Sequence, residues 1–151
     1  MDVEELYENQ YARSRLVNVK SFQCLREVFG SFSLNREELA LSFLEQGRNL
    51  LDVGCGAGSL LAGARERFYE LYGVDVSPYR VREAESLLGQ YSVDPGRLHL
   101  SVRNVDDKLP FPDGSFDAAT SIAVIEHVFD PYCVIEEIHR VLRPGGVFVA
   151  Q

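Results

Sequence analysis

The sequence predicts an α/β fold class, a doubly wound parallel sheet with helices on both faces. Two observations support it. From residue 48 onward, short apolar segments of strand length alternate with segments of helical periodicity. Strands that alternate with helices along a chain form parallel sheets through right-handed crossovers. The length of 151 residues fits one domain, and 46% apolar residues suffice for a sizeable core.

Turn signals and apolar patterns place the individual strands and helices. Ser77-Pro78 and Asp130-Pro131 are typical of N-caps followed by proline, so each is expected to open a helix. Pro144-Gly145-Gly146 is expected to end the second of these helices, and another helix is predicted over 59–68. The second helix is expected to bury Val134, Ile135, Ile138, Val141 and Leu142. The predicted strands are 49–53, 71–75, 98–102, 116–122 and 147–150.

Residues 1–47 are predicted to form a helical segment that packs on the same domain as residues 48–151. Apolar residues recur there at helical spacing. The third helix begins with a capping-box pattern at Asn35 and is expected to stop at Gly47. Tyr7 and Tyr11 in the first helix are either core residues or a lid over a ligand.

Composition and charge exclude several classes of partner. A net charge of −8 is poorly suited to binding phosphate backbones or anionic lipids, so neither nucleic acid nor a membrane surface is expected. The sequence contains no run of eighteen apolar residues, which a membrane span would require. The acidic start Met1–Glu5 lacks the pattern of a secretory signal. Three cysteines without a CxxC pair predict neither a metal site nor a disulfide framework. We therefore expect a cytoplasmic protein with a small-molecule partner.

The strongest motif is a glycine-rich turn that follows the first predicted strand, over residues 51–58 with the sequence LDVGCGAG. Glycines allow a tight turn and a close approach of the backbone to a ligand, and the next helix directs its free N–H groups to the same place. Dinucleotide-binding enzymes also have such turns, but their fingerprint requires glycine where Ser59 stands. The carboxylate of Asp52 suits a ligand with a positive end, such as an ammonium or a sulfonium.

An acidic residue, Asp75, ends the second predicted strand. A carboxylate about 20 residues past such glycines accepts hydrogen bonds from ribose hydroxyls. The alternative is that Asp75 caps the next helix, but Ser77 is better placed for that role. Both adenosyl ligands and NAD would use an acid at this position.

Five ordered motifs together resemble class I adenosylmethionine-dependent methyltransferases. The resemblance covers residues 48–151 and implies a Rossmann-like sheet of order 3-2-1-4-5, with S-adenosylmethionine as the cofactor. The most similar subgroup contains ubiquinone and menaquinone biosynthesis methyltransferases and other enzymes of small molecules. The motifs are residues 51–58, 73–77, 109–117, 125–128 and 142–146.

Carried over residue by residue, the resemblance implies a set of cofactor contacts. Asp52, Gly54 and Gly56 would hold the methionine part, within a turn that also contains Cys55 and Gly58. Asp75 would bind the ribose, and Val76 would pack against the adenine. Asn104 and Val105 would contact the adenine edge, with Asp106 as the alternative, and Ile122 with Ala123 would line the methionine end.

Two residues after the fourth strand are the catalytic candidates. His127 is a candidate general base, because its ordinary pKa is near 6.5. Glu126 is its neighbour and could join it as a metal ligand. The alternative is that both residues only shape a loop, and an electron-rich acceptor would need no base.

The resemblance also implies a C-terminal antiparallel hairpin, which is missing because the chain stops at Gln151, after the fifth predicted strand. We expect either a fragment or a partner that covers the strand edge, and self-association through Val147–Ala150 is the associated hazard. The main functional expectation is methylation of a small molecule on O, C or N. The alternative is a cofactor-binding module that is inactive or depends on a partner. An NAD dehydrogenase is disfavoured by Ser59 and by the 109–117 segment.

Overall fold

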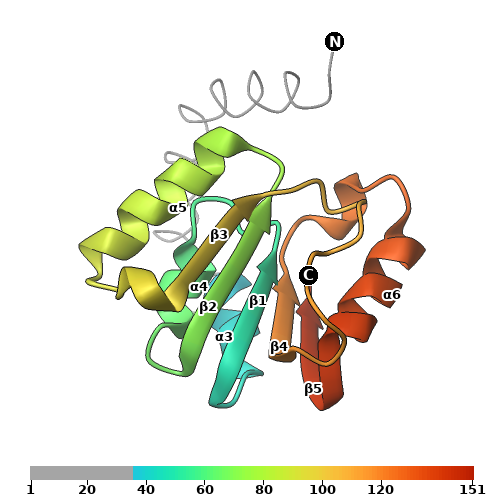
Figure 1. The fold of residues 1–151 in the computed structure, drawn as a ribbon, viewed down its shortest axis with the longest axis horizontal. Coiled ribbons are helices and arrows are strands. Elements are labelled where there is room, and N and C mark those ends of the chain that lie inside the picture. The colour runs from blue at the N-terminus through green and yellow to red at the C-terminus, as the bar shows by residue number, and fades with distance from the viewer. Residues whose placement is uncertain (1–35) are drawn as a thin grey trace, which may run out of the picture. The chain divides into compact units, whose positions relative to one another are not determined.

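The computed structural model describes residues 36–151, which form one five-stranded sheet with helices on both faces (Figure 1). All neighbouring strands pair in parallel, in the order β3-β2-β1-β4-β5. The predicted fold class and strand order are therefore confirmed. The strands are β1 (Gly47–Val53), β2 (Phe68–Asp75), β3 (Leu98–Val102), β4 (Phe116–Ser121) and β5 (Leu142–Ala150).

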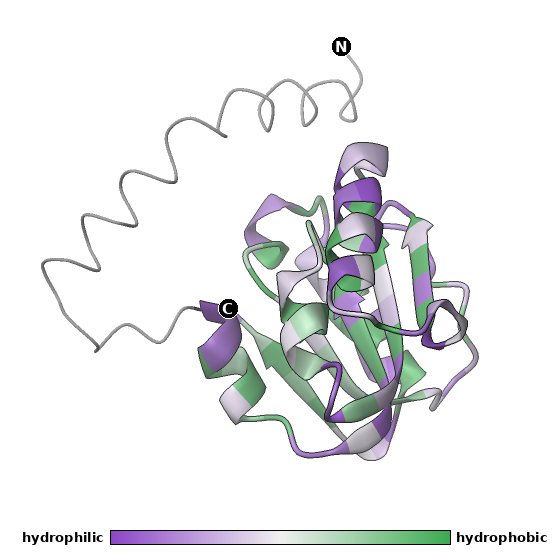
Figure 2. Cartoon of the chain, turned by 90° about the vertical axis from the view of Figure 1, so that its left-hand side faces the viewer, coloured by the Kyte–Doolittle hydropathy of each residue, from purple (hydrophilic) through white to green (hydrophobic). Residues whose placement is uncertain are grey.

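Two apolar cores lie on opposite faces of this sheet. Helices α3 (Arg36–Ser42), α4 (Ser59–Ala64) and α5 (Pro78–Gln90) bury their apolar residues against one face, and α6 (Pro131–Val141) covers the other. Figure 2 shows that the strands are coloured mainly as hydrophobic, whereas α5 alternates between hydrophilic and hydrophobic residues. The first core includes Leu50, Leu61, Leu71 and Leu88, and the second includes Leu51, Val74, Phe116 and Ile138.

The two predicted N-caps are confirmed. The Ser77 hydroxyl accepts a hydrogen bond from the Arg80 amide at 3.2 Å. The Asp130 carboxylate accepts from the amides of Tyr132 and Cys133 at 3.0 and 3.2 Å. Of the expected apolar face, Val134, Ile138 and Val141 are buried, but the prediction was wrong for Ile135, which is 43% exposed, and for Leu142, which is half-buried at the start of β5.

Several predicted helix ends lie too far along the chain. Helix α4 ends at Ala64 rather than at residue 68, because Phe68 begins β2 and pairs with Gly47. Helix α3 ends at Ser42 rather than at Gly47 for the same reason, since Gly47 is already the first residue of β1. Strand pairing has therefore overridden the local helical pattern at both places.

The predicted role of Pro144-Gly145-Gly146 as a helix end was wrong. Helix α6 already ends at Val141, and the three residues lie inside β5. The pairing with β4 jumps from Phe116–Leu142 to Ala118–Val147, so this part of β5 bulges out of the sheet. A bulge at a sheet edge is where proline and glycine are tolerated in a strand.

The expectations for residues 1–35, including the capping box at Asn35 and the lid formed by Tyr7 and Tyr11, lie outside the described residues. The part of the N-terminal segment that the structure describes, α3, packs into the first core through Ala40 and Leu41. The domain boundary at residue 47 stays a prediction. None of the helices within 36–151 combines the length and apolar character that a membrane span requires.

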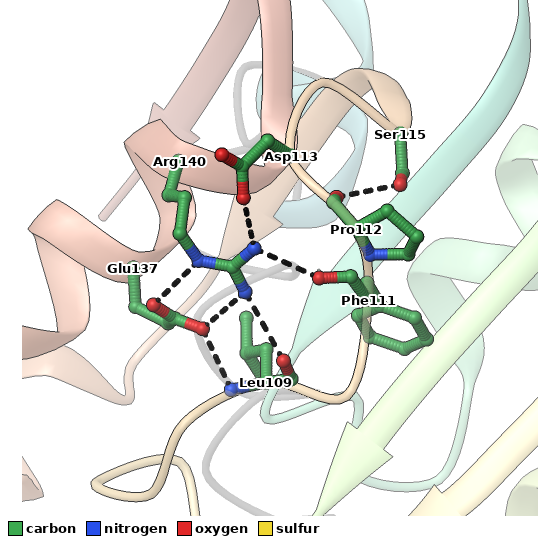
Figure 3. Close-up of polar contacts among 7 residues, drawn as sticks. All are labelled: Leu109, Phe111, Pro112, Asp113, Ser115, Glu137 and Arg140. Carbon is green, nitrogen blue, oxygen red and sulfur yellow. Dashed lines mark hydrogen bonds and ion pairs between the residues drawn. The ribbon is translucent and has the colours of Figure 1, made fainter.

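Arg140 of α6 binds the long connection between β3 and β4 (Figure 3). Its guanidinium donates to the carbonyls of Phe111 and Leu109 at 2.9 and 3.1 Å and to Asp113 at 2.6 Å. It also pairs with Glu137, which accepts from the Leu109 amide at 2.8 Å. We call this set the Arg140 cluster. It fixes residues 109–113 to α6.

Replacing Arg140 with glutamine should lower the free energy of unfolding by about 2–4 kcal/mol, because it removes the cation beside the half-buried Glu137 carboxylate and the guanidinium donors to two carbonyls. The hydrogen bond from Arg140 lowers the pKa of Glu137 below its ordinary 4.5. The loss should therefore be complete above pH 4.5 and shrink in more acid solution. Urea unfolding measures it, and Arg82→Gln, an exposed change on α5, is the control expected to stay within about 0.5 kcal/mol.

Candidate functional site

Three glycines of the turn between β1 and α4 adopt positive φ angles, but for different reasons. At Gly54 (φ 78°) an added Cβ would lie 2.2 Å from a methyl group of Val124. At Gly58 (φ 81°) it would lie 2.8 Å from the Cβ of Ala84. At Gly56 (φ 51°) it would meet no atom within 4 Å. Gly54 and Gly58 therefore permit close packing, whereas Gly56 borders open space.

Hydrogen bonds attach this turn to the end of β2. The amides of Gly54 and Cys55 both donate to the Val74 carbonyl, at 2.8 and 3.0 Å. One oxygen of the Asp75 carboxylate accepts from the Gly56 amide at 2.8 Å, and the other accepts from the Ser77 amide at 2.9 Å. Each carboxylate oxygen has a second lone pair, so Asp75 can still accept from a ligand hydroxyl.

Asp52 is a carboxylic acid in an almost fully buried position, with 3% of its surface exposed. It pairs in register with Thr120 of β4, whose hydroxyl donates to it at 2.7 Å. Burial raises the pKa of Asp52 to about 7, although the bond from Thr120 acts to lower it. The negative charges of Glu37 and Asp75 raise this pKa further. Within the described residues Asp52 forms no ion pair.

A buried carboxylate without a cation is costly, and its cost falls when a positive group binds beside it. Acidic groups from two strands flank the glycine turn, Asp52 on β1 and Asp75 on β2. Glu37 of α3 adds a third charge, and it accepts a hydrogen bond at 2.5 Å from Ser59 at the start of α4. This arrangement favours a ligand with a positive end and hydroxyl groups.

The Cys55 side chain belongs to the first core. It is 6% exposed, and a Cβ added at Gly73 would lie 2.9 Å from its sulfur. Burial, together with the nearby carboxylates of Asp52 and Asp75, raises the pKa of this thiol. A contact between Cys55 and the cofactor, which stays a prediction, would therefore use its backbone.

The residues predicted on the adenine side follow β2 and β3. Val76 is half-buried directly after β2, and Val105 is half-buried against the second core. Asn104 is exposed, and its side-chain oxygen accepts from the Asp106 amide at 3.1 Å. The carboxylate of Asp106, the alternative adenine contact, instead accepts from the Phe129 amide at 2.9 Å.

The residues predicted on the methyl side follow β4. Ile122 is half-buried against the first core, and Ala123 has a positive φ of 56°. Glu126 and His127 lie on the 3₁₀ turn Ile125–His127, and both are exposed. No group of three or more potential ligands within residues 36–151 is arranged to hold a metal ion. The catalytic roles of Glu126 and His127 stay predictions.

A hollow of about 700 Å³ lies elsewhere, along the outer edge of β3. Its lining includes the aromatic residues Tyr72 and Phe111 and the aliphatic residues Leu98 and Leu100. It shares no residue with the glycine turn, Asp75 or the 122–127 segment. It is therefore not the predicted cofactor site.

Three residues of the site were missed in the sequence. Thr120 carried a usable signal, because it is a polar residue within an apolar strand that should pair with β1. Val124 and Glu37 carried none. Val124 matters because it touches Gly54, and Glu37 because it faces Ser59, and both contacts join segments far apart in the chain.

A family model described as a methyltransferase domain matches residues 51–150, from the end of β1 to the end of β5. The chain belongs to this family. The prediction of a class I adenosylmethionine-dependent methyltransferase fold is thereby confirmed, as is its Rossmann-like sheet.

Several curated relatives are methyltransferases of small molecules. An O-methyltransferase, resE, of Aspergillus sclerotiorum is 37% identical over 114 residues, which are 75% of this chain and 42% of the relative. A ubiquinone biosynthesis O-methyltransferase of Alkalilimnicola ehrlichii is 33% identical, over 67% of this chain and 40% of the relative. An ajmaline N-methyltransferase of Rauvolfia serpentina is 35% identical, over 68% and 35%. The chain thus spans about two fifths of the length of these relatives.

Solved structures agree on the fold. A geranyl diphosphate C-methyltransferase of Streptomyces coelicolor, in complex with Mg²⁺, geranyl diphosphate and S-adenosyl-L-homocysteine, has a TM-score of 0.69 at 26% identity. It aligns over 76% of this chain and 42% of its own. A cyclase, SpnF, has a TM-score of 0.67 at 34% identity, over 75% and 42%. Similar domains therefore occur in proteins named for different reactions.

Proposed function

We propose that this chain is the cofactor-binding domain of an S-adenosylmethionine-dependent methyltransferase that acts on a small molecule. The observation that carries the proposal is the open glycine turn at Gly56, flanked by the carboxylates of Asp52 and Asp75. Because the curated relatives are longer, methyl transfer by the whole protein is part of the proposal.

The residues present fit this cofactor. Asp52 is suited to its positive methionine end, and the free lone pairs of Asp75 to its ribose hydroxyls. Val76 would pack on the adenine, Asn104 or Val105 would meet the adenine edge, and Ile122 would border the methionine end. When bound, the cofactor supplies an electrophilic methyl group, and the protein orients it and excludes water.

His127 is proposed as a proton acceptor for a hydroxyl or amine, with Glu126 beside it. Support comes from their position just after β4, on the turn that follows Val124, which contacts the glycine turn. A carbon or other electron-rich acceptor would leave both residues without a chemical role.

The second candidate is a cofactor-binding domain without methyl transfer of its own. The structural similarity to SpnF, which is named as a cyclase and not as a methyltransferase, supports this candidate. Incubation with labelled S-adenosylmethionine and a panel of hydroxyl, amine and carbon acceptors tests the first candidate. Methylated product that disappears in His127→Ala supports both the enzyme and the proposed base. Binding of S-adenosylhomocysteine without product for any acceptor class favours the second candidate.

Replacing Asp75 with alanine should weaken S-adenosylhomocysteine binding by about 1–3 kcal/mol, because hydrogen bonds to a charged acceptor are lost. Titration calorimetry measures this. Asp94→Ala is the matched control, since Asp94 also accepts a backbone amide in a turn, from Gly96 at 2.8 Å, away from the site. Equal weakening by both substitutions would contradict the role given to Asp75.

Self-association through the edge of β5 also stays a proposal. Within the described residues β5 is the last strand of the sheet, and Val147 on it is 43% exposed. Sedimentation of the chain should show dimers or larger species that decrease in Val147→Lys, because a lysine on an edge strand opposes pairing. A monomer at all concentrations would contradict this. The cytoplasmic location is likewise a proposal.

A further inference from the structure

The connection between β3 and β4 begins with a tight turn on the side of the sheet where the cofactor is proposed to bind. Asn104 lies just after β3, and its side-chain oxygen and carbonyl accept the amides of Asp106 and Asp107, at 3.1 and 3.2 Å. Residues 104–106 are therefore one local unit, and a ligand that fixes Asn104 and Val105 also fixes Asp106.

The Asp106 carboxylate reaches across to the segment between β4 and α6. One of its oxygens accepts from the amides of Phe129 and Asp130, at 2.9 and 3.4 Å. The Phe129 side chain is 96% exposed, so its packing does not orient this segment. The bonds to Asp106 and the N-cap that Asp130 forms on α6 orient the end of the segment, while Ile125 and Val128 pack against the second core.

The same segment touches the cofactor site at its other end. Val124, the first residue of this segment, lies against Gly54 of the glycine turn. Residues 124–130 therefore run from the glycine turn to Asp106, with Glu126 and His127 between the two contacts. The Arg140 cluster fixes the far half of the β3–β4 connection to α6 (Figure 3).

We propose that Asp106 is a positioning residue, which couples the adenine-side turn 104–106 to the segment that carries Glu126 and His127. The inference rests on the proposed function, because it needs the cofactor's adenine to meet Asn104 and Val105. Cofactor binding then orders the acceptor side of the site before an acceptor arrives. An acceptor that orders the segment strengthens cofactor binding by the same factor, since coupling between sites is reciprocal.

Amide hydrogen exchange, resolved by NMR, tests the coupling without any acceptor. In the unchanged protein, S-adenosylhomocysteine should slow exchange at residues 54–58 and also at Phe129 and Asp130, on the order of fivefold or more. In Asp106→Ala the slowing at 54–58 should remain and the slowing at Phe129 and Asp130 should disappear. Asp106→Asn, which keeps an acceptor oxygen, should restore part of it, and the exposed neighbour change Asp107→Ala should leave it intact.

Equal slowing at Phe129 and Asp130 in Asp106→Ala and the unchanged protein would overturn the proposal. So would slowing at 54–58 alone in the unchanged protein, which requires no variant and decides the question even if Asp106→Ala does not fold. Absence of any slowing at 54–58 would instead contradict cofactor binding at the glycine turn, and with it the proposed function on which the coupling rests.

Discussion

Replacing Asp52 with asparagine should stabilise the protein above pH 7 and weaken its binding of S-adenosylmethionine. The pKa of Asp52 is raised from 3.8 to about 7 in the folded protein. The protonated carboxyl therefore contributes stability that is complete below pH 3.8 and is lost as the pH rises through about 7. At about 1.4 kcal/mol per pKa unit, the variant should gain up to about 4 kcal/mol at pH 8–9.

The binding effect of the same substitution has the opposite sign. Removing one partner of a buried charge pair costs about 2–5 kcal/mol, so cofactor affinity should fall by a factor of about 30 or more. Chemical denaturation and titration calorimetry at pH 8.5 measure both effects. A variant that loses stability, or that binds as tightly as the unchanged protein, would contradict the role of Asp52.

Asp117→Asn is the matched control for this experiment. Burial acts to raise the pKa of Asp117, but hydrogen bonds from the Asn49 amide, Arg143 and the Arg48 amide lower it overall. Its ionised form therefore stabilises the fold above pH 3.8, and the asparagine variant should be less stable at neutral pH with unchanged cofactor affinity. The two Asp→Asn changes on neighbouring strands should thus shift stability in opposite directions.

The three glycines of the turn should respond differently to alanine. Gly54→Ala and Gly58→Ala place a Cβ against Val124 and Ala84 at a positive φ, so each should lower the unfolding free energy by about 3 kcal/mol or more. Gly56→Ala meets no atom and should cost only about 1–2 kcal/mol. It should nevertheless abolish measurable cofactor binding, because the new methyl group occupies the space proposed for the ligand.

Thermal unfolding and calorimetry with S-adenosylhomocysteine separate these outcomes. Gly89→Ala is the control, since a Cβ at this glycine of α5 also meets nothing within 4 Å but lies away from the turn. It should bind normally and unfold at the same or a slightly higher temperature, because alanine favours a helix. Normal binding by Gly56→Ala would place the ligand somewhere else.

Much of the fold could be predicted from local signals. Ser77 and Asp130 cap the helices that they were expected to cap, and the alternation of strands and helices is enough to predict the parallel sheet. The strand order came from the family resemblance. The errors lie where pairing between distant strands sets the bounds of an element. Phe68 belongs to β2 because it pairs with Gly47. Pro144 belongs to β5 because the residues on both sides of it, Leu142 and Val147, pair with β4.

In the site, too, local motifs predicted some residues, whereas contacts between distant segments could not be predicted. Residues predicted from motifs, such as Gly56 and Asp75, lie together at the ends of β1 and β2 and are joined by a hydrogen bond. The partners that set their chemistry could not be read from local patterns. Thr120 donates to Asp52 from another strand, and Asp106, expected near the adenine, binds amides 23 and 24 residues further along the chain. Such contacts depend on register and loop paths, which no short motif encodes.

Proton release on cofactor binding tests the central claim most directly, namely that the buried Asp52 carboxylate receives the positive end of an adenosyl cofactor. With a pKa of about 7, Asp52 is about half protonated at pH 7 without ligand, and a bound positive group should ionise it fully. Calorimetry of S-adenosylmethionine binding in two buffers of different ionisation enthalpy counts the protons. We predict that the unchanged protein releases about half a proton more than Asp52→Asn. Equal release by the two proteins, with both binding the cofactor, would contradict the claim.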